Sequence, residues 1–306
     1  MQYRHLGNLG IQVSALGFGA MRLPAGEDGK VDLEQSVPIL RRGIDLGINY
    51  IDTAYVYING TSEVAVGQAI KPYPRESLYL ATKIPVHSAE DADPSAWRKK
   101  LETCLKRFDT PYIDFMLFHG LGWYDFENFV GKPGSTLAEA RKAQAEGLIR
   151  HVSFSSHDSV ENILRLIDTR EFASMLVQYN YLDRHNEPAI ARAAQAGMGV
   201  VIMGPVAGGR LVTPQGVVTD AEGQLEMRTP ELALRFVWNN PDVSVAISGM
   251  NTLAMVEENA ASAARAAHMD AQENAQVAQL LERNQKLADL YCTGCAYCMP
   301  CPNEVN

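Results

Sequence analysis

Four polar residues, each just beyond a short apolar run typical of a β-strand, carry the chemistry of this sequence. They are a carboxylate, a phenol, an ammonium and an imidazole: Asp52, Tyr57, Lys83 and His119. Taken singly, each has an ordinary structural explanation: a tyrosine is often a packing residue, a lysine at a strand end is often solvated, and a lone histidine is often a core residue. Together, a phenol next to an ammonium, with a carboxylate and an imidazole, is suited to giving a proton to a carbonyl oxygen. Their shared position at strand ends predicts one site.

Short β-rich runs alternate with longer amphipathic segments along most of the chain, which predicts eight strand–helix units. The predicted strands are Ala15–Gly19, Tyr50–Asp52, Leu78–Lys83, Phe115–His119, His151–Ser155, Met175–Gln178, Val200–Met203 and Val243–Ser248. The predicted helices are Ser36–Leu46, Ser62–Ile70, Pro94–Phe108, Leu137–Glu146, Ser159–Ile167, Pro188–Ala196, Pro230–Asn239 and Leu253–Ala264. This count favours an α/β fold, a (β/α)8 TIM barrel, whose post-strand loops meet on one face. No glycine fingerprint supports the rival doubly wound sheet.

Both ends of the chain have features outside the repeating units. Tyr3–Leu6 and Val13 flank Gly7–Gly10, which predicts an N-terminal β-hairpin closing the barrel's bottom. Three predicted helices end at glycines that can adopt the left-handed conformation, namely Gly47, Gly147 and Gly197. We expect residues 1–269 to form the barrel and residues 270–306 a helical, cysteine-rich tail.

Composition restricts the partners. The 306 residues carry a formal charge of −9 and show no basic stripe, which argues against nucleic acid or an anionic membrane surface as the main partner. The first ten residues lack the apolar core of a signal peptide, and no segment approaches the roughly 20 apolar residues of a membrane span. These features predict a cytoplasmic protein.

The four residues and the barrel pattern resemble the aldo-keto reductase family along the whole barrel. The family's catalytic Asp, Tyr, Lys and His match Asp52, Tyr57, Lys83 and His119. The resemblance implies a nicotinamide cofactor extended across the barrel's C-terminal face and a small carbonyl substrate. Tyr57 would act as general acid, because a nearby Lys83 ammonium lowers the phenol pKa from about 10. Asp52 would hold Lys83, and His119 would orient the substrate oxygen.

The same resemblance assigns cofactor contacts. Ser155, Ser156 and Gln178 match the residues that hold the nicotinamide carboxamide, although Ser156 stands where many members carry Asn. Met203 replaces an aromatic ring common at its position. The remaining expected contacts are Met21, Asp52, Pro205, Gly208, Arg210, Ser248, Gly249, Met250, Glu258 and Asn259. NADPH is the expected cofactor. Two cations that hold a 2′-phosphate in several members are absent at Gly249 and Met255, which leaves NADH as the alternative.

Four of the five cysteines lie close together near the C-terminus: Cys292, Cys295, Cys298 and Cys301. In a reducing cytoplasm such clustering indicates metal or cluster ligation rather than disulfides. The spacing resembles a subgroup of aldo-keto reductases with a ferredoxin-like end, which implies a 4Fe–4S cluster. Tetrahedral Zn²⁺ is the alternative, because four thiolates also suit zinc. The fifth cysteine, Cys104, is expected to be a packing residue.

Two loops are candidates for shaping the substrate pocket. Gly120–Thr136 contains Trp123 and three further aromatic residues, which predicts either a lid packed on the barrel rim or direct substrate contact. Val212–Met227 is polar and contains glycine, and we expect it to fold over the cofactor.

The sequence thus predicts a NAD(P)H-dependent reductase of aldehydes or ketones with a C-terminal iron–sulfur motif. The alternative is a non-catalytic, nucleotide-binding redox sensor or electron-transfer adaptor. A third hypothesis joins the two: an electron-bifurcating or ferredoxin-linked reductase, in which the cluster feeds electrons toward the barrel.

Overall fold

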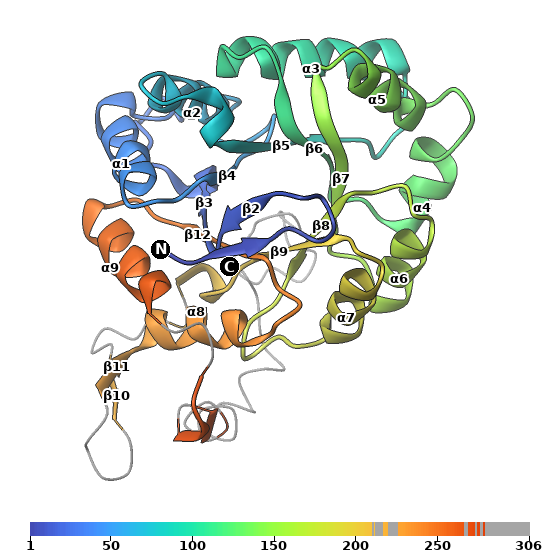
Figure 1. Cartoon of the computed structure of the whole chain (residues 1–306). Coiled ribbons are helices and arrows are strands. Elements are labelled where there is room, and N and C mark those ends of the chain that lie inside the picture. Colours follow the sequence, from blue (N-terminus) through green and yellow to red (C-terminus); the bar gives the residue numbers. More distant parts are fainter. Residues whose placement is uncertain are drawn as a thin grey trace.

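The computed structural model describes residues 1–209, 211, 217–219, 226–265, 269–272, 274–275 and 278. Within this part of the chain, eight parallel strands close into a barrel in the order β12-β3-β4-β5-β6-β7-β8-β9 (Figure 1). The strands are β3 Leu16–Gly19, β4 Tyr50–Asp52, β5 Tyr79–Pro85, β6 Ile113–His119, β7 Ile149–Ser155, β8 Ser174–Gln178, β9 Gly199–Met203 and β12 Val245–Gly249. The predicted (β/α)8 barrel is therefore confirmed.

Helices surround the barrel and alternate with its strands (Figure 1). The principal ones are α1 Leu33–Asp45, α2 Ser62–Ile70, α3 Pro94–Phe108, α5 Thr136–Ala145, α6 Val160–Asp168, α7 Glu187–Gln195, α8 Thr229–Asn239 and α9 Leu253–Ala264. Shorter helical segments are η1 Ala20–Arg22, η2 Arg75–Ser77, α4 Trp123–Asp125, η3 Phe126–Val130 and η4 Ala207–Gly209. The largest shift from prediction is at α1, which begins three residues early because the Asp32 side chain caps it by accepting from the Gln35 backbone N–H.

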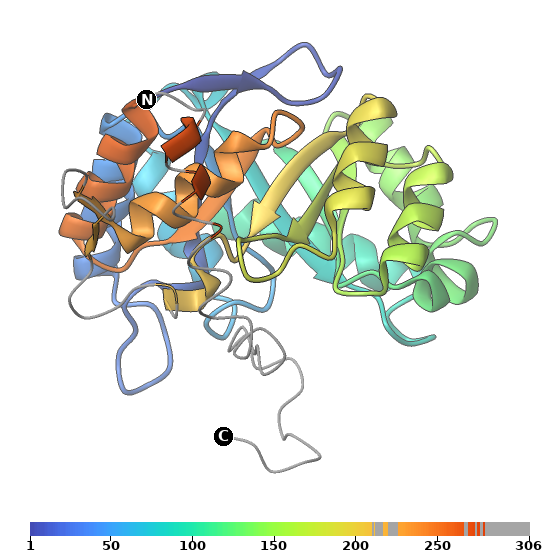
Figure 2. The ribbon, with the colours of Figure 1, turned by 90° about the horizontal axis from the view of Figure 1, so that it is seen from below.

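A β-hairpin lies across one end of the barrel, as predicted (Figure 2). It pairs β1 Tyr3–His5 with β2 Gln12–Ser14 in antiparallel register. Leu6 and Val13 are fully buried and belong to the same apolar cluster as side chains from six barrel strands. The hairpin thus seals the bottom of the barrel interior, at the N-terminal ends of its strands.

The predicted helix stops are also present. Gly47, Gly147 and Gly197 have φ values of 95°, 79° and 73°, in the left-handed region that favours glycine. Gly7, in the hairpin turn, also has a positive φ of 52°, and close packing gives a second reason for glycine there. A Cβ there would lie 2.5 Å from the Gly197 carbonyl oxygen, so the hairpin turn packs directly on the backbone that follows α7.

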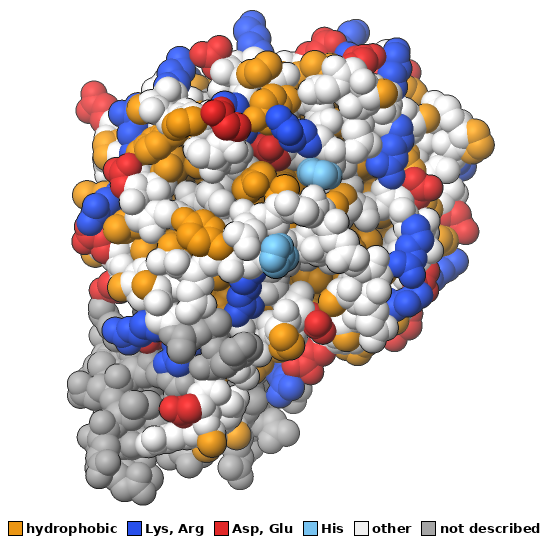
Figure 3. All heavy atoms as spheres, viewed as in Figure 1, with side chains coloured by type: hydrophobic (Ala, Val, Ile, Leu, Met, Phe, Trp, Pro, Cys, Tyr) orange, Lys and Arg blue, Asp and Glu red, His pale blue; other side chains and the backbone are white. Residues whose placement is uncertain are grey.

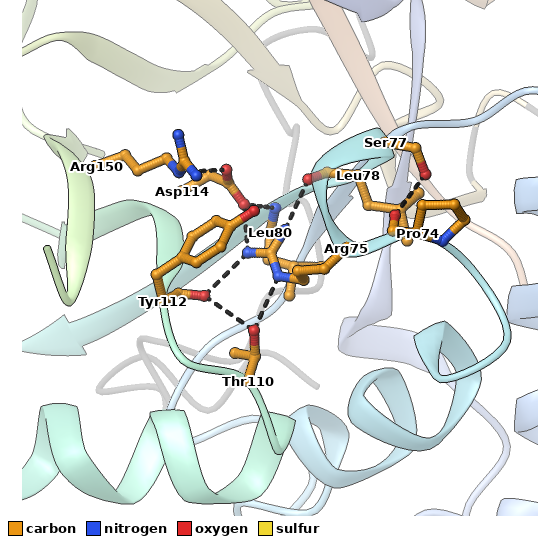
Figure 4. A network of polar contacts seen from close by, with 9 residues as sticks. All are labelled: Pro74, Arg75, Ser77, Leu78, Leu80, Thr110, Tyr112, Asp114 and Arg150. Atoms are coloured by element: carbon orange, nitrogen blue, oxygen red, sulfur yellow. Dashed lines mark hydrogen bonds and ion pairs between the residues drawn. The ribbon is translucent and has the colours of Figure 1, made fainter.

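A polar network joins β5, β6 and β7 at the end of the barrel away from the loops that follow the strands (Figure 4). The buried Asp114 carboxylate accepts from Arg75 at 2.6 Å and from the Leu80 backbone N–H at 3.0 Å. The Tyr112 ring contacts two guanidinium groups, those of Arg75 and Arg150, each 4.1 Å from its centroid. Because it lies at the N-terminal ends of the strands, we assign this network to stability rather than chemistry.

The two loops singled out in the sequence contain more regular structure than predicted. Gly120–Thr136 holds α4 and η3. The Val212–Met227 segment was expected to be a plain loop, yet its described backbone forms strand β10 Val217–Thr219, which pairs antiparallel with β11 Glu226–Arg228. The prediction missed this pairing because the segment as a whole is polar and contains glycine, although two short stretches within it pair as strands.

Charged and apolar side chains are mixed on the face seen in Figure 3, where basic groups lie among acidic ones. Over the described part of the chain, no helix is both long and apolar enough to cross a bilayer. Cys104 is fully buried in the main core between helices and barrel, which confirms its predicted packing role.

Candidate active site

The four predicted catalytic residues come from three adjacent strands and the loop after one of them. Asp52 is the last residue of β4, and His119 is the last of β6. Lys83 lies in β5, between those strands, two residues before its end. Tyr57 follows β4 in a tight turn, its backbone N–H donating to the Ala54 carbonyl. Strand order therefore explains why residues 67 positions apart in the chain meet.

Lys83 is the centre of the site. Its ammonium donates to the Asp52 carboxylate at 2.6 Å, to the Thr53 carbonyl at 2.7 Å and to the Tyr57 hydroxyl at 3.3 Å. These three acceptors match the three N–H donors of an ammonium, so its position is fixed. The side chain is only 1% exposed. Sequence reasoning missed the Thr53 carbonyl, since a backbone acceptor leaves no signature in residue types.

The Asp52 carboxylate is held in an apolar setting. Burial raises its pKa, and the Lys83 ammonium opposes that rise. One oxygen takes the lysine, while Oδ2 is buried and has no hydrogen-bond partner among the residues described. A buried carboxylate oxygen without a donor is unusual, because it gives up hydration without replacement.

His119 presents a neutral imidazole at this site. Burial, then the Lys83 ammonium and to a lesser degree the neighbouring His87 and His157 imidazoles, holds its pKa well below the usual range. Its ring lies edge-on to Tyr57, with centroids 5.7 Å apart and planes at 82°. At neutral pH the ring therefore offers one N–H donor without a positive charge.

The outer side of the site includes an imidazole–carboxylate pair that sequence reasoning missed. His87 Nδ1 lies 2.8 Å from Asp125 Oδ2, and the histidine is about half exposed beyond β5. The signal was weak, because the two residues are 38 positions apart and neither follows a strand directly. The aromatic ring of Trp123, by contrast, packs on Phe126 and beneath the Arg165 guanidinium.

The expected carboxamide contacts divide into two kinds. The Ser155 hydroxyl accepts from the Gly120 backbone N–H at 2.9 Å, and within the described part of the chain its own O–H has no acceptor. The Ser156 hydroxyl already donates to the Leu121 carbonyl at 2.7 Å and accepts from the Asp158 N–H. Ser156 therefore serves the loop more than a ligand. Gln178, at the end of β8, donates through its amide to Asp183 at 3.2 Å and is nearly buried.

The remaining expected contacts follow β3, β9 and β12. Gly249 pairs with Gly19 across β12 and β3, and Asn259 donates to the Ser248 hydroxyl at 3.2 Å. Met250 is fully buried in the core, which leaves its backbone alone for a ligand. Met21, Gly208 and Glu258 are exposed, Met203 packs against the barrel interior and Pro205 is buried. Arg210 lies outside the described residues.

These positions divide the barrel into two arcs. The predicted catalytic residues lie on or just after β4, β5 and β6, and the expected cofactor positions other than Asp52 lie at the ends of β7, β8, β9, β12 and β3 or after them. A family model for the aldo/keto reductase family matches residues 15–282, which includes both arcs. The chain belongs to this family. As an aldo-keto reductase, it is an NAD(P)-dependent oxidoreductase.

Known proteins resemble this one over most of its length. AKR11C1 from Bacillus halodurans, in its holo form, is 27% identical with a TM-score of 0.75 and covers 92% of this chain and 96% of that one. An aldo-keto reductase from Klebsiella pneumoniae in complex with NADPH is 26% identical, with a TM-score of 0.73 over 92% and 95% of the two chains. L-galactose dehydrogenase from Arabidopsis thaliana is 27% identical over 286 residues, 86% of this chain and 88% of that protein.

The four clustered cysteines, Cys292, Cys295, Cys298 and Cys301, lie outside the described residues of this aldo-keto reductase, as does most of the predicted helical tail. Within the part that is described, no group of three or more His, Cys, Asp or Glu side chains is arranged to hold a metal ion.

Proposed function

We propose that the protein reduces an aldehyde or ketone to an alcohol, with Tyr57 as the proton donor. One observation carries the proposal: the Lys83 ammonium lies 3.3 Å from the Tyr57 hydroxyl while its other donors are held by Asp52 and Thr53. A positive charge fixed beside a phenol stabilises the phenolate that forms when the proton leaves. Nothing in a non-catalytic sensor or adaptor requires this arrangement, and the comparisons lend that alternative no support.

Each residue of the proposed tetrad then has one task. Reduced nicotinamide, when bound, supplies the hydride. Tyr57 donates its proton to the substrate oxygen, and Lys83 stabilises the resulting phenolate. The neutral His119 imidazole donates a hydrogen bond to the same oxygen and orients it, without competing as an acid. Asp52 holds Lys83 in register and balances its charge in a buried setting.

The residues of the second arc fit a nicotinamide cofactor. The unpaired Asp52 Oδ2 is a buried acceptor that a hydroxyl of a bound ligand can satisfy. Ser155 retains an O–H donor, and the Gln178 amide has both a carbonyl and an N–H to match a carboxamide. We therefore assign carboxamide binding to Ser155 and Gln178, with Ser156 supporting the loop between them and α6.

NADPH is the proposed cofactor, as in the Klebsiella pneumoniae protein. Cations are missing at Gly249 and Met255, yet the Arg22 side chain packs against Gly249, so positive charge remains at that edge. Titration with NADPH and NADH, followed by protein fluorescence, decides between them. Equal affinity for both cofactors would contradict the proposal.

The proposed role of Tyr57 is tested by Tyr57→Phe, with Tyr124→Phe on the exposed α4 as the matched control. Loss of a general acid should lower kcat about 10²–10⁴-fold. The Kd for NADPH should stay nearly unchanged, because the ring remains in place. The control should keep wild-type turnover. Wild-type kcat in Tyr57→Phe would remove Tyr57 from the mechanism.

We further propose that Cys292, Cys295, Cys298 and Cys301 hold a 4Fe–4S cluster that exchanges electrons with a protein partner. The support is the close spacing of four thiols, which suits iron–sulfur ligation. Purification without oxygen, followed by iron and acid-labile sulfide analysis and a visible spectrum, tests it. About four iron and four sulfide per chain are expected. Zinc without sulfide would make the tail a structural metal site instead.

A further inference from the structure

A carboxylate that the proposed mechanism does not use lies fully buried behind the site. Glu63, in the first turn of α2, has no exposed surface. One of its oxygens accepts from the Thr82 hydroxyl at 2.6 Å, and the other from Arg107 at 2.9 Å. Thr82 directly precedes Lys83 in β5, so Glu63 is bonded to the strand that carries the central ammonium. Burying a charge in this way is costly unless it is paired and hydrogen-bonded.

The same guanidinium reaches the loop that carries Tyr57. Arg107 Nη1 also donates to the Tyr55 carbonyl at 2.8 Å, and the guanidinium lies 4.5 Å from the centroid of the Tyr55 ring. A Cβ on Gly60 would lie 2.5 Å from Arg107 Nη2, so the guanidinium packs tightly on the loop's far end. Arg107 thus contacts the loop on both sides of Tyr57.

This loop has an unfavourable backbone. Ile58, Asn59 and Gly60 are three successive residues with positive φ, at 48°, 52° and 76°. A β-branched residue such as Ile58 is uncommon in this region and is strained there. A backbone of this kind persists only where its surroundings fix it. The fixed end is at Tyr55, whose N–H donates to the Lys83 carbonyl at 3.0 Å while its own carbonyl takes Arg107.

We propose that Arg107, held by Glu63, is a positioning residue that keeps the Tyr57 hydroxyl beside the Lys83 ammonium. The inference rests on the proposed role of Tyr57 as proton donor. Glu63 bonds the strand of Lys83 through Thr82 and the loop of Tyr57 through Arg107. One buried carboxylate therefore fixes the relative placement of the phenol and the ammonium. The planar guanidinium suits this task, because it serves two acceptors and stacks on a ring at once.

The first test measures the phenol itself and needs no activity. The ionisation of Tyr57 is followed by ultraviolet titration of the protein without cofactor, as the difference between each protein and its Tyr57→Phe counterpart. In Arg107→Met the phenol should move away from Lys83, and its midpoint should rise by about one pH unit. Arg98→Met is the matched control: Arg98 lies on the same helix, α3, with a side chain 22% exposed against 23% for Arg107. Its midpoint should equal that of the wild type.

The second test uses turnover. Arg107→Met should lower kcat about 10- to 100-fold, with the KM for NADPH unchanged and the alkaline limb of the kcat profile moved upward. Arg107→Lys should recover part of kcat, since an ammonium can still reach one of the two acceptors. If Arg107 is merely structural, Arg107→Met should lower the midpoint of thermal unfolding, but it should leave the midpoint of the Tyr57 titration and the pH profile of kcat unmoved. That result would overturn the inference.

Two further outcomes are distinguishable. If Arg107→Met fails to fold, Thr82→Val removes the other bond of Glu63 while keeping a side chain of similar shape, and the phenol midpoint should again rise. An unchanged midpoint in folded Thr82→Val would contradict the inference. If the midpoint moves in Arg107→Met but Tyr57→Phe keeps wild-type turnover, positioning holds and the proposed role of Tyr57 fails.

Discussion

Replacing Lys83 with Met tests the charge balance of the site, because it leaves Asp52 without its only charged partner in the described site. The Asp52 side chain is 2% exposed, and its second oxygen already lacks a donor. With the ammonium gone, burial raises the pKa of the carboxyl without opposition, so the folded variant takes up a proton. In the unfolded chain the same carboxyl has a pKa of about 3.9.

The expected magnitude follows from the cost of that proton. At pH 7, which is about 3 pH units above the pKa of the carboxyl in the unfolded chain, protonating that carboxyl costs about 4 kcal/mol, at about 1.4 kcal/mol per pH unit. This agrees with the roughly 3–5 kcal/mol lost when one partner of a buried pair is removed. The direction of the pH dependence also follows: because the pKa of Asp52 is higher in the folded variant than in the unfolded chain, the variant loses stability as pH rises from about 4 towards the folded pKa.

The measurement is urea unfolding of wild type and Lys83→Met at pH 5.5 and pH 7. The deficit of the variant should grow by about 2 kcal/mol between these pH values. Asp52→Asn combined with Lys83→Met is the control, because an amide carries no charge to neutralise, and its deficit should change little with pH. A deficit of Lys83→Met that is the same at both pH values would refute the account of a buried, proton-coupled pair.

Two other predictions follow from single side chains. Acid should destabilise the protein as pH falls below about 6.5, because His119 binds a proton in the unfolded chain but stays neutral when buried, where its pKa is lowered. The expected loss of unfolding free energy at pH 5.5 is about 1.4 kcal/mol. Urea unfolding of His119→Asn should not show this loss. If His119→Asn keeps the wild-type pH dependence, another group is responsible. Trp123→Ala should cost about 2 kcal/mol of stability through lost packing on Phe126 and Arg165, yet leave the KM for carbonyl substrates unchanged. A changed KM would return Trp123 to the pocket.

Much of this architecture is predictable because the signals are local. Each barrel strand is a short apolar run, and each of Asp52, Lys83 and His119 lies at or near the end of one. Parallel strands of a barrel bring such ends to one face, so spacing along the chain converts directly into proximity. The hairpin was predictable for a similar reason, since Gly7–Gly10 marks a turn between two short runs.

What could not be predicted depends on contacts between distant segments. In the sequence Arg107 is one more basic residue in the last turn of a helix, the place where cations are favoured by the helix dipole. Glu63 is an acid in a first turn, which is equally ordinary. Only packing of α2 against α3 shows that the two neutralise each other and reach the loop of Tyr57. The engagement of Ser156 by Leu121 and Asp158 is hidden in the same way.

The two arcs of the barrel have a consequence for how the site can vary. The residues that we propose for proton donation are held by buried pairs: Asp52 with Lys83 inside the barrel, and Glu63 with Arg107 behind it. Removing one partner of such a pair leaves an uncompensated charge, so this arc tolerates little change. The proposed cofactor positions depend instead on hydroxyls, amides and backbone after five other strands, whose loss costs a neutral hydrogen bond each, about 1 kcal/mol. Departures such as Ser156 and Met203 fall on that second arc, where we expect a substitution to alter cofactor affinity without disturbing Tyr57, the proposed proton donor.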